Sequence, residues 1–437
     1  MEPRLQRRYR TLVQEHLGST HSVATGLRSL SQTSKPFSAA QAAWRFFANE
    51  RVSLTTLAEP ILDYARAISS SRLNKYALVI HDFSGINFAR HESKADRISL
   101  YRKSDLGYFL QSALLVSDRT GDPVAPLYIG LEAADGIHSS RRETPLPRRR
   151  QIDELNRTFG SVESLGLAQP CVHIVDRQAD SLLHLRRFVR CRRLFVIRSD
   201  DVRRVEFEAQ SLLLEEVERQ IAKHYRDVGE VEYKGTTAKQ YVAETKVVLK
   251  RLGRTNRPTK DEANKRQWIK GKPVELRYVV SQVRNKRGTV LATWRLWTNV
   301  SEQVKTEEIA RWYYFRWRIE SYFKLLKRGG QNLEQWQQES AEAVAKRLLI
   351  VAQVCVIVWA LADSKEKQAK PIRQFLVRIS GRLMKRGVEY TSSALLAGMW
   401  QFLAMIDVLE SHTTAELEEM ANEFLQIIGM KTKFKDV

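Results

Sequence analysis

The stretch YALVIHD at residues 76–82 marks a change in the sequence from a helical period to the pattern of a buried strand. It is a short run of apolar and β-branched residues that ends in Asp82. Similar runs occur at residues 108–118, 124–135, 171–176 and 194–199, with helical patterns at residues 151–165 and 179–188. Three strands followed by alternating helices and strands predict a mixed α/β sheet.

Two of these strands are predicted to end in an aspartate, Asp82 and Asp176. Ligands of open α/β sheets bind in the crevice at the carboxyl ends of strands. An aspartate at one strand end is weak evidence for a site, because strand-to-loop turns favour aspartate in any case. Both residues are therefore candidates that need further support.

Helical and β-rich segments flank this sheet. Residues 1–70 have helical spacing with Ser38 as the expected N-cap, and they form either a small DNA-reading domain or an ordinary helical layer. Residues 201–300 read as a β-rich insertion with a charged loop, TKDEANKRQWIKGK, at residues 259–272. We expect a helical DNA-end-binding domain at 1–70, a catalytic domain at 71–365 and a helical C-terminal region at 366–437.

The apolar run LLIVAQVCVIVWALA at residues 348–362 is shorter than a membrane span and contains a glutamine, so it predicts a buried core helix. Three cysteines form no CxxC pair, which suits a reducing cytoplasm. The formal net charge of +22 favours a polyanionic partner. DNA would offset this charge, although an anionic membrane surface would attract it too.

The segment RWYYFRWRIESYFKLLKRGG at residues 311–330 holds many cations and one carboxylate, Glu320. Drawn as one continuous helix, it places Tyr313, Arg316, Glu320, Lys324 and Lys327 on one stripe. Such a stripe suits phosphate binding, and the acid on it suggests a metal ion. The alternative is a solvated face with ordinary pairs four residues apart, such as Arg316 with Glu320.

Asp82, Asp176 and Glu320 together have the chemistry of a site for a hard cation, Mg²⁺ or Mn²⁺. No histidine or cysteine cluster accompanies them. Two such ions can activate water and stabilise the leaving oxygen of a phosphodiester.

The spacing Y-x2-R-x3-E-x6-K is present as Tyr313, Arg316, Glu320 and Lys327, with VIHD and VDRQAD upstream. The chain thereby resembles the DDE transposases of bacterial insertion sequences, in the cut-and-paste group with the Tyr-Arg-Glu-Lys signature. The resemblance covers residues 20–360. It implies a ribonuclease-H-like fold whose mixed sheet is split by a β-rich insertion, with a helical N-terminal DNA-binding domain.

The resemblance also implies roles for single residues. The carboxylates of Asp82, Asp176 and Glu320 match the catalytic metal-binding triad. The residues that match contacts with DNA are Tyr313, Arg316, Lys327 and Arg198, with Lys324 on the same stripe. Trp294 is similar in placement to a tryptophan that replaces a flipped base, with Trp297 as the rival and sheet packing as the alternative for both. For Arg198 the alternative is a solvent-facing strand end.

The function implied is DNA transposition. Such an enzyme binds terminal inverted repeats, cuts each end with Mg²⁺ (Mn²⁺ also supporting activity), passes through hairpin ends and joins the freed 3′ hydroxyl to target DNA. We expect a homodimer on paired ends of double-stranded DNA, in the bacterial cytoplasm with the nucleoid, and no membrane partner. The alternatives are a ribonuclease-H-like nuclease without transposition and a non-catalytic DNA-binding inhibitor of transposition.

Overall fold

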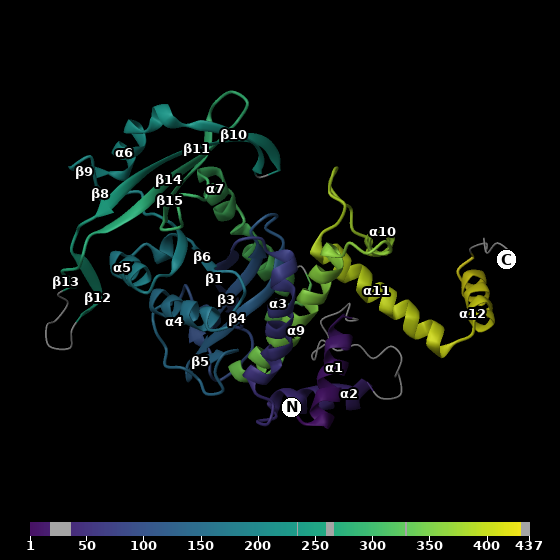
Figure 1. The fold of residues 1–437 in the computed structure, drawn as a ribbon. Coiled ribbons are helices and arrows are strands. Elements are labelled where there is room, and N and C mark those ends of the chain that lie inside the picture. Colours follow the sequence, from purple (N-terminus) through teal and green to yellow (C-terminus); the bar gives the residue numbers. More distant parts are fainter. Residues whose placement is uncertain (18–35, 234, 259–265, 328–329, 430–437) are drawn as a thin grey trace. The chain divides into compact units, whose positions relative to one another are not determined.

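The computed structural model describes residues 1–17, 36–233, 235–258, 266–327 and 330–429 (Figure 1). Contacts divide the chain into two compact units, one of residues 1–53 with 324–437 and one of residues 54–323. All the strands described lie in the second unit, and the first is helical. The protein therefore has the mixed α/β class that the sequence predicts.

The strands of the second unit form a mixed sheet of 13 strands and a separate two-stranded hairpin. They are β1 (Ala77–Asn87), β2 (Ile98–Ser99), β3 (Leu106–Ser117), β4 (Pro123–Ala133), β5 (Gly136–Ser139), β6 (Cys171–Val175), β7 (Leu194–Arg198), β8 (Arg204–Phe207), β9 (Gln210–Leu213), β10 (Arg226–Tyr233), β11 (Thr236–Leu249), β12 (Gly253–Pro258), β13 (Arg266–Ile269), β14 (Val274–Arg284) and β15 (Val290–Thr298). The order in the sheet is β5-β4-β3-β1-β6-β7-β15-β14-β11-β8-β9, with β2 beside β3 and β10 beside β11.

The helices lie in both units. They are α1 (Pro3–Leu17), α2 (Pro36–Ala48), α3 (Leu54–Arg72), α4 (Gln151–Glu163), α5 (Leu182–Arg190), α6 (Leu214–Gln220), α7 (Thr306–Tyr314), α8 (Trp317–Leu326), α9 (Ala341–Asp363), α10 (Ala369–Ile379), α11 (Ser392–Ser411) and α12 (Thr414–Ile427), with short 3₁₀ turns η1 (Arg177–Ala179), η2 (Ala222–His224) and η3 (Leu333–Gln335). The expected N-cap at Ser38 is wrong, because α2 begins at Pro36. Proline suits a first helical turn, where its missing N–H has no intrahelical partner.

The middle of the sheet brings two predicted acidic positions to neighbouring strands. The parallel pairing of β1 with β6 ends at His81 and Val175, so Asp82 and Asp176 are the next residues on the two strands. The expectation that Asp82 ends its strand is wrong. β1 continues to Asn87, because its antiparallel pairing with β3 extends along its whole length.

The segment expected as a β-rich insertion is rich in strands, from β8 to β15. Most of these strands extend the main sheet, because β15 pairs with β7 with Leu296 opposite Arg198. The insertion also contains α6. The hairpin of β12 and β13 lies outside the main sheet.

Apolar spacing places the helices of the second unit on the sheet. α5 buries Leu182, Leu185 and Phe188, which recur every three residues on one face of the helix. These side chains share a core cluster with Phe195 and Ile197 of β7. Full burial of each such side chain contributes roughly 1.5–3 kcal/mol. α3 packs on β4, so this helix belongs with the sheet although it lies within the expected N-terminal segment 1–70.

The predicted buried helix at residues 348–362 is confirmed within α9, whose side chains are buried on all faces. Among the described residues, α9 and α11 are long and apolar enough to cross a membrane by length and composition. Most of the apolar part of α9 is buried inside the protein, and less of α11 is. α9 contacts α1, α2, α10 and α11 within the helical unit.

A buried polar cluster joins α1 to α9 and α11. The Arg347 side chain donates from Nε to Nε2 of His16 at 3.3 Å and from Nη1 to Gln338 at 3.1 Å, and it stacks on Trp336 at 4.2 Å. The Trp400 indole donates to the His16 carbonyl at 3.0 Å. Burial, and then the charge of Arg347, lowers the pKa of His16 to about 3 against an opposing effect of the Leu12 carbonyl.

This cluster predicts a loss of stability in mild acid. His16 is neutral in the folded protein until about pH 3, whereas an unfolded histidine gains its proton below about pH 6.5. The free energy of unfolding should therefore be complete above pH 6.5 and fall below it, by at most about 1.4 kcal/mol per pH unit from this group. Thermal unfolding of the parent and of His16→Gln at pH 7.5 and pH 5 measures this. A pH dependence as steep in His16→Gln as in the parent would contradict it.

Candidate active site

The basic segment at residues 311–330 does not form one helix. α7 ends at Tyr314 and α8 begins at Trp317, so the prediction of one continuous helix is wrong, although Tyr313, Arg316 and Glu320 still meet at one site. At the corner the Arg316 N–H donates to the Tyr313 carbonyl at 3.0 Å, a tight bond between residues three apart. The regular α-helical hydrogen bonds are therefore interrupted between Tyr313 and Glu320 of the signature.

Packing of aromatic side chains explains this corner. Phe315 is buried, and its ring lies where a Cβ at Gly121 would be, at 2.3 Å from the ideal position. Gly121 also has a φ of +71°, which favours glycine. The Trp312 indole donates to the Asp118 carbonyl at 3.1 Å. The turn between β3 and β4 thus receives both rings and fixes the start of α8.

Three carboxylates surround the guanidinium of Arg316. Nη1 lies 3.3 Å from Asp82 Oδ2, and Nη2 lies 2.9 Å from Glu320 Oε1 and 3.8 Å from Asp176 Oδ2. The arginine is buried, at 7 % exposed, so it does not lie on a solvated face, although the pair with Glu320 that this alternative named is present. The structure thus brings together the three acids that the sequence singles out, from β1, the end of β6 and α8.

The acidic site has an unusual charge balance. Burial raises the pKa of Asp82 to about 6 and outweighs the lowering effects of the Phe83 amide and Arg316, while Asp176 and Glu320 add smaller increases. Burial alone would lower the pKa of Arg316, but Tyr313 and the three carboxylates raise it. Three acids around one arginine leave an excess of negative charge when all are ionised.

Asp176 is positioned by the residues that flank it. It caps η1, where its Oδ1 accepts the Arg177 N–H at 2.7 Å. The Tyr313 hydroxyl donates to the same oxygen at 3.2 Å, and the end of Arg198 lies 3.9 Å from it. Burial and the nearby carboxylate raise the pKa of Tyr313, so its hydroxyl keeps the proton that it donates. Arg198 ends β7 and is partly exposed. Two of the residues predicted to contact DNA, Tyr313 and Arg198, therefore lie beside Asp176.

The two candidate tryptophans of β15 occupy different environments, because residues three apart in a strand point to opposite faces. Trp297 is fully buried, lies 5.5 Å from the Tyr278 ring and donates to Asp180 at 3.3 Å, as the packing alternative expects. Trp294 is also buried, at 7 % exposed, so packing remains an alternative for it; its ring lies 6.2 Å from that of Tyr313, which contacts Asp176. Trp294 is therefore the tryptophan beside the acidic site.

The two lysines of the signature stripe belong to the helical unit. Lys324 is exposed in α8, and Lys327 lies 3.7 Å from Glu334 in an ion pair. The three carboxylates belong to the other unit, that of residues 54–323. Their contacts with phosphate stay a prediction.

Sequence analysis missed a buried histidine pair behind the acids. His81 Nε2 lies 2.9 Å from His173 Nδ1, and His173 Nε2 lies 3.3 Å from Glu163, with the Phe159 ring stacked on His173 at 3.8 Å. These contacts join β1 to β6 one residue before Asp82. A polar histidine inside each of two apolar strands, VIHD and VHIVD, was the available signal.

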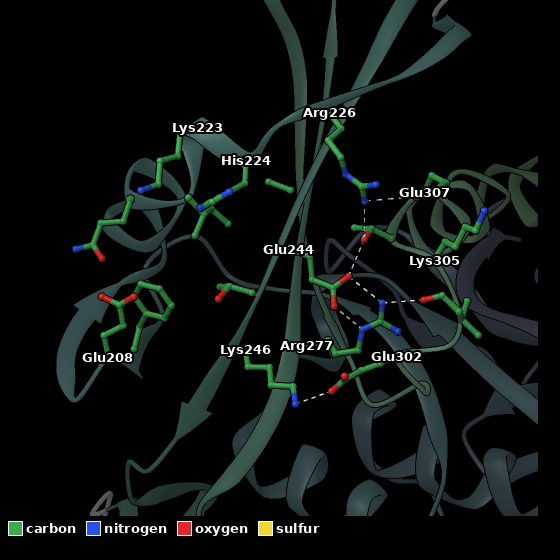
Figure 2. A pocket seen from close by; sticks show the side chains of 17 residues that line it. Glu208, Lys223, His224, Arg226, Glu244, Lys246, Arg277, Glu302, Lys305 and Glu307 are labelled. Carbon is green, nitrogen blue, oxygen red and sulfur yellow. Dashed lines mark hydrogen bonds and ion pairs between the residues drawn. The ribbon is translucent and has the colours of Figure 1, made fainter.

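A cavity of about 960 Å³ lies at the other end of α7 from Tyr313, between α7 and the strands β11 and β14 (Figure 2). Its charged side chains form ion pairs, which Figure 2 draws: Arg277 with Glu244, Lys246 with Glu302, and Arg226 with Glu307. Arg277 also donates to the carbonyls of the loop before α7, at Val300, Ser301 and Val304. The cavity network therefore holds the start of the helix that carries Tyr313.

The acidic residues offer the oxygen donors that Mg²⁺ and Mn²⁺ prefer. As they stand, no group of three or more acidic, histidine or cysteine side chains in the described part of the chain is close enough to hold a metal ion. The guanidinium of Arg316 lies between the carboxylates instead. The donor set fits a hard cation, provided that Arg316 moves aside.

No protein-family model matches this sequence, and no curated protein sequence matches it either.

Proposed function

We propose that the protein is a DNA transposase that cuts and joins phosphodiesters at the site of Asp82, Asp176 and Glu320. One observation carries the proposal: these carboxylates, far apart in the sequence, meet around a single cation. A second supports it, because Tyr313 and Arg316 of the signature both contact acids of that site. Structural salt bridges also gather charge, but an acidic cluster in which one carboxyl group, here Asp82, has a strongly raised pKa is typical of functional sites.

The finer fold that we propose is ribonuclease-H-like. β4, β3 and β1 form an antiparallel meander, and β6 and β7 continue beside β1 in parallel. An antiparallel meander followed by parallel strands is the arrangement of that core. The proposed insertion is the β-rich segment 201–300, and the helical ends at 1–70 and 366–437 are the proposed regions for end binding and for dimer contact.

In the proposed reaction, Asp82, Asp176 and Glu320 hold the metal, Mg²⁺ or Mn²⁺. When bound, the metal lowers the pKa of attacking water and stabilises charge on the phosphoryl oxygens. Arg316 exchanges the carboxylates for a phosphate of the bound strand, since guanidinium pairs with either anion. Tyr313 holds Asp176 in orientation through its hydroxyl, and Arg198 beside them offers a second phosphate contact.

One carboxylate site can serve every step, because hydrolysis, hairpin formation, hairpin opening and strand transfer are all displacements at phosphorus. The proposed substrates are the paired inverted-repeat ends of the element and its target duplex, bound by a homodimer. We propose that every step uses the same divalent cation site, occupied by Mg²⁺ or Mn²⁺. Binding should weaken steeply with salt, since the net charge of +22 neutralises many phosphates.

The test is incubation of the full-length protein with duplexes that carry its element's ends, in Mg²⁺ and in EDTA, with products resolved as nicks, hairpins and joined DNA. We expect all three products, in Mg²⁺ only. Cleavage without joining would favour a ribonuclease-H-like nuclease of another role. Binding without any metal-dependent nick would favour a non-catalytic inhibitor.

The tryptophans give a further prediction. Trp294→Ala should slow hairpin formation more than first-strand nicking, because this ring lies beside the acids and is the one placed to replace a flipped base. Both tryptophans are buried, so either variant should lower the free energy of unfolding, by about 3–5 kcal/mol for Trp297→Ala, but Trp297→Ala should leave the ratio of hairpin formation to nicking at the parent value. Single-turnover gels with each variant and urea unfolding measure these effects. A normal hairpin rate in Trp294→Ala would assign Trp294 to packing alone.

A further inference from the structure

The hairpin of β12 and β13 carries a dense positive charge. The described residues 251–258 and 266–272 include six cations and no acid: Arg251, Arg254, Arg257, Arg266, Lys270 and Lys272. The two strands pair with each other, with Arg254 opposite Trp268, and they form a sheet of their own outside the main sheet. Since isolated two-stranded ribbons are marginally stable, such a ribbon needs an anchor or a partner.

The base of the hairpin has an anchor on α5. Arg186 donates from Nε to the Lys272 carbonyl at 2.9 Å and from Nη2 to the Arg251 carbonyl at 2.8 Å. One side chain therefore binds the backbone at both ends of the hairpin. Two glycines allow this approach. A Cβ at Gly253 would lie 2.2 Å from Leu183, and one at Gly271 would lie 2.9 Å from Arg186. The base of the hairpin is thereby fixed to α5, within the unit of residues 54–323.

Large apolar side chains of the hairpin face solvent beside these cations. Trp268 is 52 % exposed, and Leu252 and Ile269 are exposed as well. Lys270 and Lys272 are also exposed. Exposed apolar side chains within a positively charged ribbon match what DNA grooves accept. The major groove admits a two-stranded ribbon, and apolar wedges with flanking cations bind minor grooves.

We propose that the β12–β13 hairpin is a DNA-binding arm that lies against duplex DNA, with Lys270 and Lys272 on phosphates and Trp268 in a groove. This inference rests on the proposed function, since it adds a contact surface to the same enzyme. Residues 251–272 hold eight Lys and Arg residues and two acids, Asp261 and Glu262, so the arm as a whole is positively charged. Duplex DNA is the polyanion whose groove dimensions suit a ribbon of this width.

The experiment measures binding of full-length protein to a duplex of the element end and to an unrelated duplex, over a range of KCl concentrations. The test variants are Trp268→Ala and Lys270→Gln with Lys272→Gln. The matched control is Lys286→Gln with Arg287→Gln, two exposed cations on the turn between β14 and β15. Melting temperature is measured for each protein, and all substituted side chains are exposed, so the fold is expected to persist.

We expect the double lysine variant to bind about tenfold more weakly and to lose about 2 from the log–log salt slope, with the control unchanged. A loss shared by both duplexes assigns the arm to DNA of any sequence, and a loss with the element end alone assigns it to that end. Unchanged affinity and slope would overturn the proposal. So would binding to anionic vesicles that depends on Trp268 while DNA binding does not.

The two proposals fail separately. A parent protein that cuts the element end while its arm variants bind DNA normally would reject the arm alone. A parent that binds duplex DNA through the arm but cuts nothing in Mg²⁺ would reject the transposase and leave the arm.

Discussion

Glu320→Gln is expected to lower metal-dependent cleavage of end DNA by at least about 10³-fold while DNA affinity changes less than about twofold. The substitution keeps the shape of the side chain and removes one anionic ligand of the proposed site. Transition-state stabilisation by the metal then falls by several kcal/mol, whereas the cations that bind DNA stay in place. Single-turnover cleavage and a binding titration with the same duplex measure the two quantities.

The matched control is Glu308→Gln. Glu308 is exposed to the same extent as Glu320, at 40 %, and also pairs with an arginine of its helix region, Arg311 at 3.8 Å. Cleavage by this variant should stay near the parent rate. Equal loss of cleavage and binding in Glu320→Gln would contradict the division between the acidic site and the DNA-binding surface.

Arg316→Gln is expected to make the fold depend on divalent cations. Without its guanidinium, the three carboxylates lose the cation that lies between them. Because Asp176 and Glu320 are partly exposed, we expect a loss of about 1–3 kcal/mol, between the values for exposed and for buried ion pairs. Mg²⁺ or Ca²⁺ should then raise the melting temperature of the variant more than that of the parent, because the ion meets no competing guanidinium. Thermal unfolding with EDTA and with each ion measures this.

Asp82→Asn in the Arg316→Gln background is the control. It removes one of the repelling charges, so the double variant should be more stable without metal than Arg316→Gln and should gain less from it. Equal stabilisation of parent and variant by divalent cations would show that Arg316 and the metal do not compete for these carboxylates.

Local patterns in the sequence were sufficient for the strands around the site. The apolar runs before Asp82 and before Asp176 predict buried strands, and both strands are confirmed. Burial of both faces explains why these runs are nearly continuous. The ends of the strands were harder to predict. β1 extends beyond Asp82 because it pairs with β3, and a local sequence pattern does not reveal this pairing.

The corner between α7 and α8 could not be predicted from helical spacing. It depends on Phe315 packing against Gly121, which lies almost two hundred positions away in the sequence. The same limit applies to the histidine pair, since His81 and His173 become neighbours only when β1 and β6 pair. The choice between Trp294 and Trp297 also depended on which face of β15 joins the core cluster, and that cluster contains Trp297.

The position of Arg316 changes how the signature is understood. Its spacing predicts an arginine on a stripe that faces DNA, whereas the structure holds it among the acids. One side chain can serve both states, provided that it leaves the carboxylates when metal and DNA bind. Such an exchange would keep the acids together before substrate arrives, because the guanidinium offsets part of their repulsion.

The most direct test of the central claim is a crystal structure of the protein with end DNA and Mn²⁺, recorded at a wavelength where manganese scatters anomalously. We predict an anomalous peak in contact with Asp82, Asp176 and Glu320, with the Arg316 side chain turned to a phosphate. A cleavage-competent complex whose manganese lies elsewhere, or whose three acids stay bound to Arg316 alone, would contradict it.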